Sequence, residues 1–448
     1  MELNQSVAVP RRILSSLLSS LSAGVVPRAG APYIAIGRKD EIAAFLSDLE
    51  NIGDGGSSMR FLIGRYGSGK SFLMQLVRGY ALERDFLTAD ADLTPERRLY
   101  GSGGSGVATY RELMRNLASK ASPDGGALPK IIARWIGDLQ AKLGEEDPDG
   151  TRLRDAVMQD LRSVEFLVGG FDFARVISAY YRAYMDGNDE LMSACLCWLR
   201  GEFASKTEAR RALGFSVSLI IDDDNWYDFI KLFGVLARRI GYRGFVVFID
   251  ECVNLYKIVH RVSRENNYEK ILSMFNDALQ GKAEGLLMVL GGTPQFLEDP
   301  RRGLFGYEAL RSRLCDSRFH DDEFRNLIGP VIRLRRLSDD ELFALIVRVT
   351  ALYAQHYHWE PRITSEQQIR FLTLALSRTG SNSMMTPREI LRDYLTVLNI
   401  LMQNEDADFE RIIARVSAES ASAADEEKIE SAETGVKKHD FSPEDIIL

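Results

Sequence analysis

The segment MRFLIGRYGSGKSF spans residues 59–72 and decides the fold. Its first part, RFLIG, is a short apolar run that predicts a buried strand, and the part that follows contains the full pattern G-x-x-x-x-G-K-S. Glycines at this spacing let successive backbone N–H groups turn toward an anion, and the helix predicted to follow adds its positive end. The segment therefore predicts a phosphate-binding loop between a strand and a helix.

The residues of this loop have distinct expected roles. Lys70 would reach the β- and γ-phosphates of a nucleotide, and the Ser71 hydroxyl would coordinate Mg²⁺. The predicted ligands are therefore ATP and Mg²⁺. The residues expected to surround the nucleotide are Gly64, Arg65, Tyr66, Gly67, Ser68, Gly69, Lys70, Ser71 and Phe72.

A loop of this kind needs a carboxylate on a neighbouring strand to hold the metal. Two segments offer one, SVSLIIDDD at 216–224 and GFVVFIDE at 244–251. The second is favoured, because Asp250 would lie on the magnesium side and Glu251, directly after it, would act as the catalytic base. Asp222–Asp224 run straight into NWYDF, where negative charge is typical of a helix start, and they are the alternative.

Other polar residues follow in positions that would complete such a site. Thr293 ends the apolar run GLLMVLGG, and open α/β sheets bind their ligands at the carboxyl ends of strands. Its hydroxyl would position the attacking water, although a hydroxyl that ends a strand before Pro294 is also common in turns. Arg311 or Arg313, in RRGLFGYEALRSRL, would deliver a guanidinium to the γ-phosphate of a neighbouring subunit.

Two further motifs lie outside this set. GSGGSG at 101–106 superficially resembles a phosphate loop, but no apolar strand precedes it and it contains no Lys, so we interpret it as a linker. Arg388 begins a predicted helix behind Pro387, where a guanidinium would touch the nucleotide and report its state. Arg392, one turn later, is the alternative.

The order of predicted elements divides the chain into four parts. Residues 1–30 predict an N-terminal helix and linker, and residues 31–335 predict a nucleotide-binding core in which strands and helices alternate. A mostly helical insertion interrupts the alternation at about 94–215. Residues 336–415 predict a helical lid, and residues 416–448 predict a disordered acidic tail rich in Ser, Ala and Glu.

The composition limits the class of protein. Lys and Arg total 56 against 64 Asp and Glu, and this acidic balance argues against non-specific coating of nucleic acid while leaving room for a local basic contact. Four cysteines in 448 residues make no disulfide framework and indicate a reducing compartment. No apolar run reaches the roughly 18 residues of a membrane span, so we expect a cytoplasmic protein with no membrane partner.

Taken in order, these motifs resemble those of an AAA+ ATPase. IGRKDEI at 36–42 is similar to the G-R-x-x-E box of Orc/Cdc6-like members. That resemblance implies that the backbone of Ile36, Gly37 and Arg38 contacts the adenine. It also implies an α/β fold: an AAA+ P-loop NTPase with a parallel-sheet core, an α-helical insertion and a C-terminal helical lid domain. The long insertion departs from the commonest pattern of the class.

From about Arg11 to Leu401 the chain resembles, more narrowly, the BrxD-type ATP-binding proteins of BREX phage-defence systems. RYGSGKSFL, GYRGFVVFIDECVNLYK and RRGLFGYEALRSRL carry this likeness. It implies a homo-oligomer that couples its nucleotide state to assembly on DNA or on defence-system proteins such as a helicase or a DNA methyltransferase. The alternative is a nucleotide-dependent switch or scaffold with little turnover. Glu251 favours hydrolysis, because a pure switch needs no base.

Overall fold

The computed structural model describes residues 9–101, 103–143, 151–315, 325–377 and 385–414. The chain forms two compact units. We call residues 37–336 the sheet unit. The helical unit combines the segments 1–36 and 337–448.

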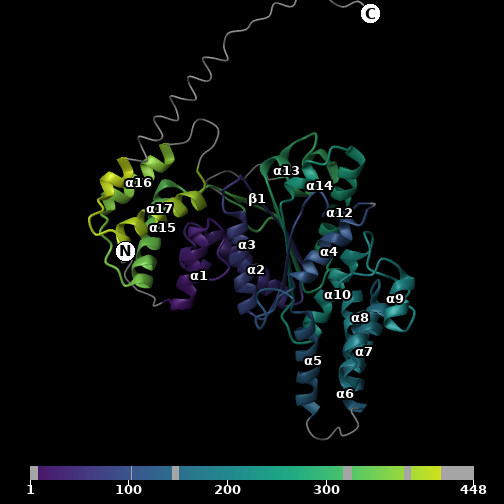
Figure 1. The fold of residues 1–448 in the computed structure, drawn as a ribbon. Helices are drawn as coiled ribbons and strands as arrows, with labels where there is room; N and C mark the ends of the chain where they lie inside the picture. The colour runs from purple at the N-terminus through teal and green to yellow at the C-terminus, as the bar shows by residue number, and fades with distance from the viewer. Residues whose placement is uncertain (1–8, 102, 144–150, 316–324, 378–384, 415–448) are drawn as a thin grey trace, which may run out of the picture. The chain divides into compact units, whose positions relative to one another are not determined.

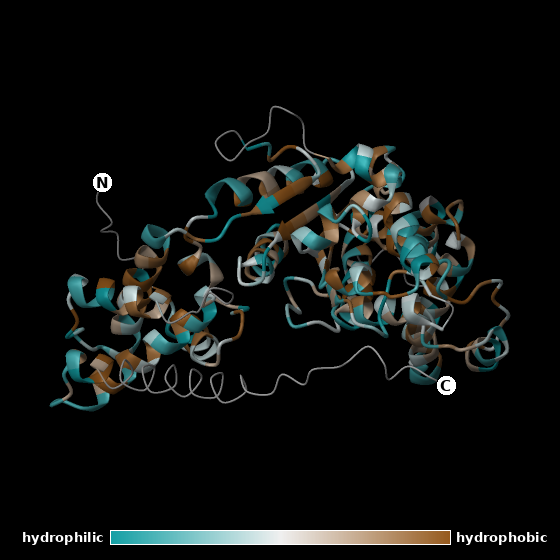
Figure 2. Cartoon of the chain, turned by 90° about the horizontal axis from the view of Figure 1, so that it is seen from above, coloured by the Kyte–Doolittle hydropathy of each residue, from teal (hydrophilic) through white to brown (hydrophobic). Residues whose placement is uncertain are grey.

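The sheet unit is built on five parallel strands in the order β2-β3-β4-β1-β5. The strands are β1 Ser58–Gly64, β2 Leu87–Asp92, β3 Phe245–Asp250, β4 Leu286–Gly292 and β5 Val331–Leu334. The central strands are buried along nearly their whole length, as expected of parallel strands covered on both faces, and Figure 2 shows them mostly in the brown of hydrophobic residues. The apolar runs quoted above predicted β1, β3 and β4, and the segment FLTADADL at 86–93 predicted β2. They did not predict β5, because VIRL is short, lies at an edge and contains Arg333.

Helices cover both faces of this sheet (Figure 1). On one face lie α2 Lys39–Gly53 and α3 Lys70–Glu83, and on the other lie α10 Trp226–Arg239 and α12 Arg261–Leu279. Alternate strand residues face the second pair, and Phe61 of β1 meets Phe275 of α12 edge to face at 5.8 Å between ring centroids. Short helices follow β3 and β4, namely α11 Val253–Tyr256, α13 Pro294–Glu298, η3 Leu304–Gly306 and α14 Glu308–Leu314.

Between β2 and α10 the chain forms the helical insertion. Its helices are α4 Ser105–Arg115, α5 Leu128–Leu143, α6 Thr151–Glu165, α7 Gly170–Asp186, α8 Asp189–Leu199 and α9 Lys206–Leu213. Helices α5, α6 and α7 pack side by side and extend away from the sheet (Figure 1). Their buried apolar residues belong to the same hydrophobic cluster as residues of the strands, so the insertion is part of the sheet unit.

The expected linker at 101–106 instead opens a helix. Gly104 is the N-cap residue of α4, and its left-handed backbone (φ +81°) suits glycine. The Asp223 carboxylate accepts hydrogen bonds from the backbone N–H groups of Gly104, at 2.7 Å, and Val107, at 2.8 Å. An acid from the same chain therefore fills the anion-binding end of this helix. Sequence spacing could not show this contact, since its partners lie more than 100 residues apart.

A buried ion pair joins helix α2 to strand β1. The Arg60 guanidinium donates to both carboxylate oxygens of Asp48 at 2.7 Å and also bonds to the carbonyls of Ile328 and Gly329. Both side chains are 9% exposed. Desolvation raises the pKa of Asp48 although the Arg60 hydrogen bonds and charge oppose that shift. Removal of either partner would leave a buried charge without compensation.

We therefore expect Asp48→Ala to lower the free energy of unfolding of the sheet unit by about 3–5 kcal/mol. Urea unfolding followed by tryptophan fluorescence measures this, because Trp135, Trp198 and Trp226 all lie in this unit. The matched control is Glu50→Ala. Glu50 lies on the same helix as Asp48, and its ion pair with Arg243 is exposed, so its loss should change the free energy of unfolding little. Equal effects of the two substitutions would contradict the role given to burial.

The helical unit consists of α1 Arg11–Ser22, η1 Ala31–Ile34, α15 Asp339–Tyr357, α16 Ser365–Ser377 and α17 Pro387–Gln403. Helix α1 packs on α15 and α17 through Leu14, Leu17, Leu18 and Leu21. Helix α15 begins with a capping box of Ser338 and Glu341, and α17 with one of Thr386 and Glu389. The N-terminal helix thus shares one compact unit with helices that follow it by more than 300 residues. The tail expected at 416–448 lies outside the described residues.

No helix in the described ranges combines the length and the apolar character that a membrane crossing requires.

Candidate functional site

The loop between β1 and α3 has the shape of a phosphate cradle. Gly67 and Gly69 have φ angles of +75° and +89°, a conformation that side chains disfavour. A side chain at Gly64 would also collide with the loop, since its Cβ would lie 2.3 Å from the Ser68 hydroxyl. The glycine positions of the motif therefore follow from the backbone path, which ends at the N-terminus of α3.

Lys70 and Ser71, the first residues of α3, are poised for an anion and a cation. The Lys70 ammonium donates only to loop carbonyls, those of Gly64 at 3.0 Å and Arg65 at 3.3 Å, and has no ion-pair partner in the described part of the chain. Burial lowers the pKa of Lys70, against the opposing charges of Asp250 and Glu251. A phosphate bound in the loop would stabilise the charged form of this partly buried ammonium through charge-assisted hydrogen bonds. The loop therefore fits a nucleotide.

The magnesium ligands expected from the sequence lie together. The Ser71 hydroxyl donates to Asp250 Oδ2 at 2.7 Å, and Asp250 is only 8% exposed. A hydroxyl beside a carboxylate is an oxygen donor set that suits Mg²⁺. This pair would hold the metal and link it to the loop.

This contact crosses a strand. Asp250 ends β3 and Ser71 follows β1, but β4 lies between these two strands. The carboxylate passes over Gly291 of β4, where an added Cβ would stand 2.3 Å from Asp250 Oδ1 and 2.7 Å from Met74 Cε. Because Gly291 has no side chain, the Asp250 carboxylate can reach the loop. The sequence analysis missed this residue, although a Gly-Gly pair at the end of a buried apolar run was a signal for it.

We expect Gly291→Ala to lower kcat for ATP by roughly 100-fold, because displacing the Asp250 carboxylate by about 1 Å misplaces the metal side of the site. ATP binding should persist, since the loop itself is untouched. Phosphate release and the binding of a fluorescent ATP analogue measure the two quantities. Gly79→Ala on α3, where a Cβ meets nothing within 4 Å, is the matched control. A Gly291→Ala protein with the turnover of the wild type would refute the assignment.

Glu251, the expected base, has an unusual backbone. Its φ is +57°, and a non-glycine residue in this region costs about 1 kcal/mol or more, a strain found most often at functional sites. Its N–H donates to Asp250 Oδ1 at 2.8 Å, so the two oxygens of Asp250 are fixed by Ser71 and Glu251. The Glu251 side chain is exposed and open to water.

Asp92 adds a third carboxylate that the sequence analysis did not single out. It ends β2 directly opposite Asp250 in the register. Asp92 keeps an exposed surface, but partial desolvation at the strand end, and then the charges of Asp250 and Glu251, raise the pKa of its carboxyl. The carboxyl ends of β2 and β3 therefore form an acidic edge of the kind that a bound cation would neutralise.

Two alternatives from the sequence have structural roles. Thr293 is the N-cap residue of α13, where its hydroxyl accepts from the N–H of Phe296 at 3.3 Å. Its proton can still be donated to a water, and it lies at the carboxyl end of β4. Residues 216–224 form no strand, and Asp223 is engaged in capping α4.

The two arginines of α14 differ in their surroundings. Both side chains are exposed. Arg313 donates to the carbonyl of Ala309, one turn earlier in the same helix, at 2.7 Å. The Arg311 guanidinium has no hydrogen-bond or ion-pair partner in the described ranges. Arg311 is therefore the one whose guanidinium is available to another molecule.

The remaining expected contacts are distributed over both units. Arg38 is buried, and its guanidinium donates to the carbonyls of Ser68, at 2.8 Å, and Arg335, at 2.9 Å. Arg38 therefore stabilises the phosphate loop through the Ser68 carbonyl. The sequence did not predict this role. Gly37 has a left-handed backbone (φ +71°). Ile36 ends the first segment of the helical unit.

Arg388 lies on the first turn of α17 in the helical unit, and its side chain is exposed. The alternative, Arg392, pairs with Asp393 at 3.2 Å.

Comparison with known proteins identifies a family for this chain. No curated protein matches the chain. The family described as BREX system ATP-binding protein BrxC/D matches residues 9–417, which include the loop, Asp250, Glu251 and the arginines of α14. The likeness to BrxD-type proteins expected from the sequence is confirmed, and the chain belongs to the BrxC/D family of BREX system ATP-binding proteins.

Proposed function

We propose that this BREX ATP-binding protein is a magnesium-dependent ATPase that couples its nucleotide state to assembly on DNA or on other proteins of the defence system. The observation that carries the proposal is the Ser71–Asp250 contact of 2.7 Å, formed across β4 and followed at once by the strained, solvent-exposed Glu251. A scaffold that only binds ATP has no need of a carboxylate held in this way beside the metal ligands.

Each residue of the site has a distinct role in the proposed reaction. The loop N–H groups and Lys70 bind the β- and γ-phosphates, and Ser71 and Asp250 would hold Mg²⁺. Magnesium, when bound, neutralises charge between the two phosphates. Glu251 accepts a proton from a water, whose oxygen forms a bond to the γ-phosphorus while the bond from that phosphorus to the bridging oxygen of ADP breaks. Thr293 would orient this water through its remaining hydroxyl proton.

The proposed partners are supported by the family and by the exposed groups. Arg311 would stabilise the γ-phosphate charge of a neighbouring copy in a homo-oligomer. Arg388 would report the nucleotide state to the helical unit, and the backbone of Ile36–Arg38 would contact the adenine. DNA, a helicase or a DNA methyltransferase is the kind of partner that a defence system of this type would supply, and we place the protein in the cytoplasm.

Metal removal tests the proposal directly. We expect the purified chain to release phosphate from ATP in Mg²⁺ and to lose this activity in EDTA, because Ser71 and Asp250 can orient the phosphates only through a cation. The assay is run with and without DNA, since an assembly-dependent ATPase is faster on its assembly partner. A chain that binds ATP but shows no turnover under any of these conditions is a switch or scaffold instead.

A further inference from the structure

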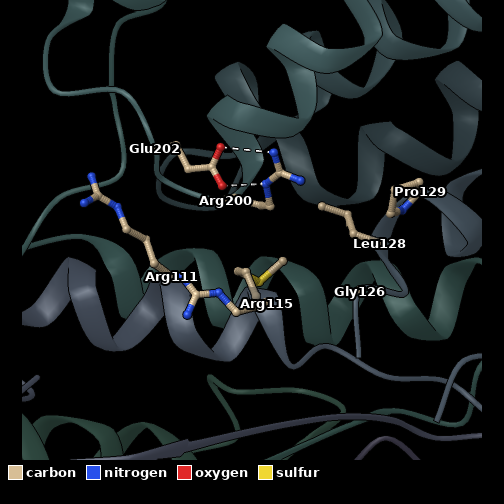
Figure 3. Close-up of a pocket in the computed structure, with 8 residues that line it drawn as sticks. Arg111, Arg115, Gly126, Leu128, Pro129, Arg200 and Glu202 are labelled. Atoms are coloured by element: carbon tan, nitrogen blue, oxygen red, sulfur yellow. Dashed lines mark hydrogen bonds and ion pairs between the residues drawn. The ribbon is translucent and has the colours of Figure 1, made fainter. Parts of the chain in front are cut away.

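A cavity lies in the helical insertion. It has a volume of about 480 Å³ and lies between α4, the end of α8 and the start of α5. Its lining residues are Arg111, Met114, Arg115, Gly126, Leu128, Pro129, Arg200 and Glu202. Figure 3 shows Arg111 and Arg115 along one wall and the paired Arg200 and Glu202 on the facing side. None of these residues belongs to the ATP site.

The charge around this cavity is positive. Arg200 is paired with Glu202 at 2.8 Å, and Glu112, which does not line the cavity, is shared by Arg97 at 3.1 Å and Arg115 at 2.9 Å. The residues that line the cavity carry a net charge of +2, from Arg111, Arg115 and Arg200 against Glu202. An acidic protein with this local excess offers a place for an anion.

Arg111 supplies the uncompensated group. Its Nε donates to the carbonyl of Gly201 at 2.7 Å, and its two terminal nitrogens have no partner within the ranges that the structure describes. The neighbouring Tyr110 hydroxyl donates to the carbonyl of Leu199 at 2.6 Å. These two bonds tie α4 to the end of α8, so the cavity wall and the guanidinium are held in place before any ligand arrives.

The floor of the cavity is apolar. Met114 and Leu128 are 1% and 3% exposed, so they close the cavity from within the core, and Pro129 is the apolar lining residue that is partly exposed to a ligand. A site with two guanidinium groups beside a partly exposed proline suits an organic group that carries a phosphate. The volume lies in the range of small-molecule sites, roughly 300–1,000 Å³.

We propose that this cavity binds the phosphate of a nucleotide, with Arg111 and Arg115 on the phosphate and the rest of the nucleotide in the remaining volume beside Pro129. The nucleotide is either free or the 5′-phosphorylated end of a nucleic acid strand. The two sources share one recognition chemistry, a terminal phosphate attached to a base-bearing sugar. This site goes beyond the proposed ATPase activity and does not depend on it.

The test uses the full chain with Lys70→Ala, which weakens phosphate binding by the loop so that the second site is measured. The probes are thymidine 5′-monophosphate, a short 5′-phosphorylated single-stranded oligonucleotide, and the same oligonucleotide with a 5′-hydroxyl. We expect saturable binding of at least one phosphorylated probe. Binding of the monophosphate alone assigns a free nucleotide, and binding of the phosphorylated oligonucleotide assigns a strand end.

In the same background, the double substitution Arg111→Gln and Arg115→Gln should weaken that binding by roughly tenfold or more, because two charge-assisted contacts are lost. Arg115→Gln alone should give part of the loss and leave the fold intact, since that side chain is 73% exposed. Arg154→Gln, an exposed arginine of α6 outside the cavity, is the matched control.

Three results would overturn the site: no binding of either phosphorylated probe, equal binding of the 5′-hydroxyl oligonucleotide, or affinity unchanged by the double substitution. The double substitution in the wild-type chain should retain phosphate release from ATP, which separates failure of this inference from failure of the ATPase proposal.

Discussion

Glu251→Gln should lower kcat for ATP by roughly 1,000-fold while the chain still binds ATP, because a general base contributes about 10²–10⁴ to such a rate. The substitution keeps the size and polarity of the side chain and removes only its ability to accept the proton. The Asp250 contacts should survive, since they use the backbone N–H of residue 251 and the Ser71 hydroxyl. Steady-state phosphate release measures kcat, and a fluorescent ATP analogue measures binding.

Glu265→Gln is the matched control, since this glutamate of α12 is partly exposed and pairs with Arg261 on the same helix. Two outcomes would change the assignment. If Glu251→Gln turns over ATP like the wild type, the base is another group, and Asp92, opposite Asp250, becomes the first candidate. If the variant also loses ATP binding, Glu251 has a structural role in the loop.

Arg311→Ala should lower kcat by roughly 1,000-fold in the assembled protein if its guanidinium serves a neighbouring site, since an arginine supplied in trans contributes about 10³–10⁵. Its side chain is exposed, and among the residues that the structure describes its guanidinium has no hydrogen-bond or ion-pair partner, so the substitution should leave the fold intact. Arg313→Ala is the control, because Arg313 bonds to its own helix, and it should have a much smaller effect.

A mixing experiment separates action in trans from a local effect. Arg311→Ala subunits retain Glu251, and Glu251→Gln subunits retain Arg311, so a shared site between the two kinds of subunit contains both groups. We expect the mixture to recover activity that neither variant has alone. Absence of recovery, or a protein that remains monomeric with bound ATP analogue in mass photometry, would remove the role of Arg311 in trans.

Much of the site was accessible from local sequence. The phosphate loop depends on glycine backbone angles and on a helix N-terminus, which are properties of adjacent residues, so G-x-x-x-x-G-K-S predicted it. Apolar runs predicted β1, β3 and β4 for the same reason, and FLTADADL predicted β2. Asp250 and Glu251 were favoured over Asp222–Asp224 because a second carboxylate that can act as a base directly follows the first.

Other features depend on residues that are far apart in the chain. Ser71 and Asp250 are separated by 179 positions, and their contact requires a strand order in which β4 lies between them and Gly291 leaves room. Asp223 caps α4 instead of binding a metal because the fold brings it to Val107, which lies 116 residues earlier in the chain. Strand β5 has too few apolar residues to be recognised until β1 pairs with it.

The sequence by itself therefore determined that this chain has a phosphate loop, an acidic strand end and the motifs of a BREX ATP-binding family, because each of these is encoded in contiguous residues. Tertiary structure alone decided which acid reaches the loop, that Arg38 bonds to Ser68, and that the arginines of α4 and Arg200, directly after α8, line one cavity. The physical reason is that packing and hydrogen bonding act between surfaces, and the chain brings those surfaces together only when the sheet and its insertion have formed.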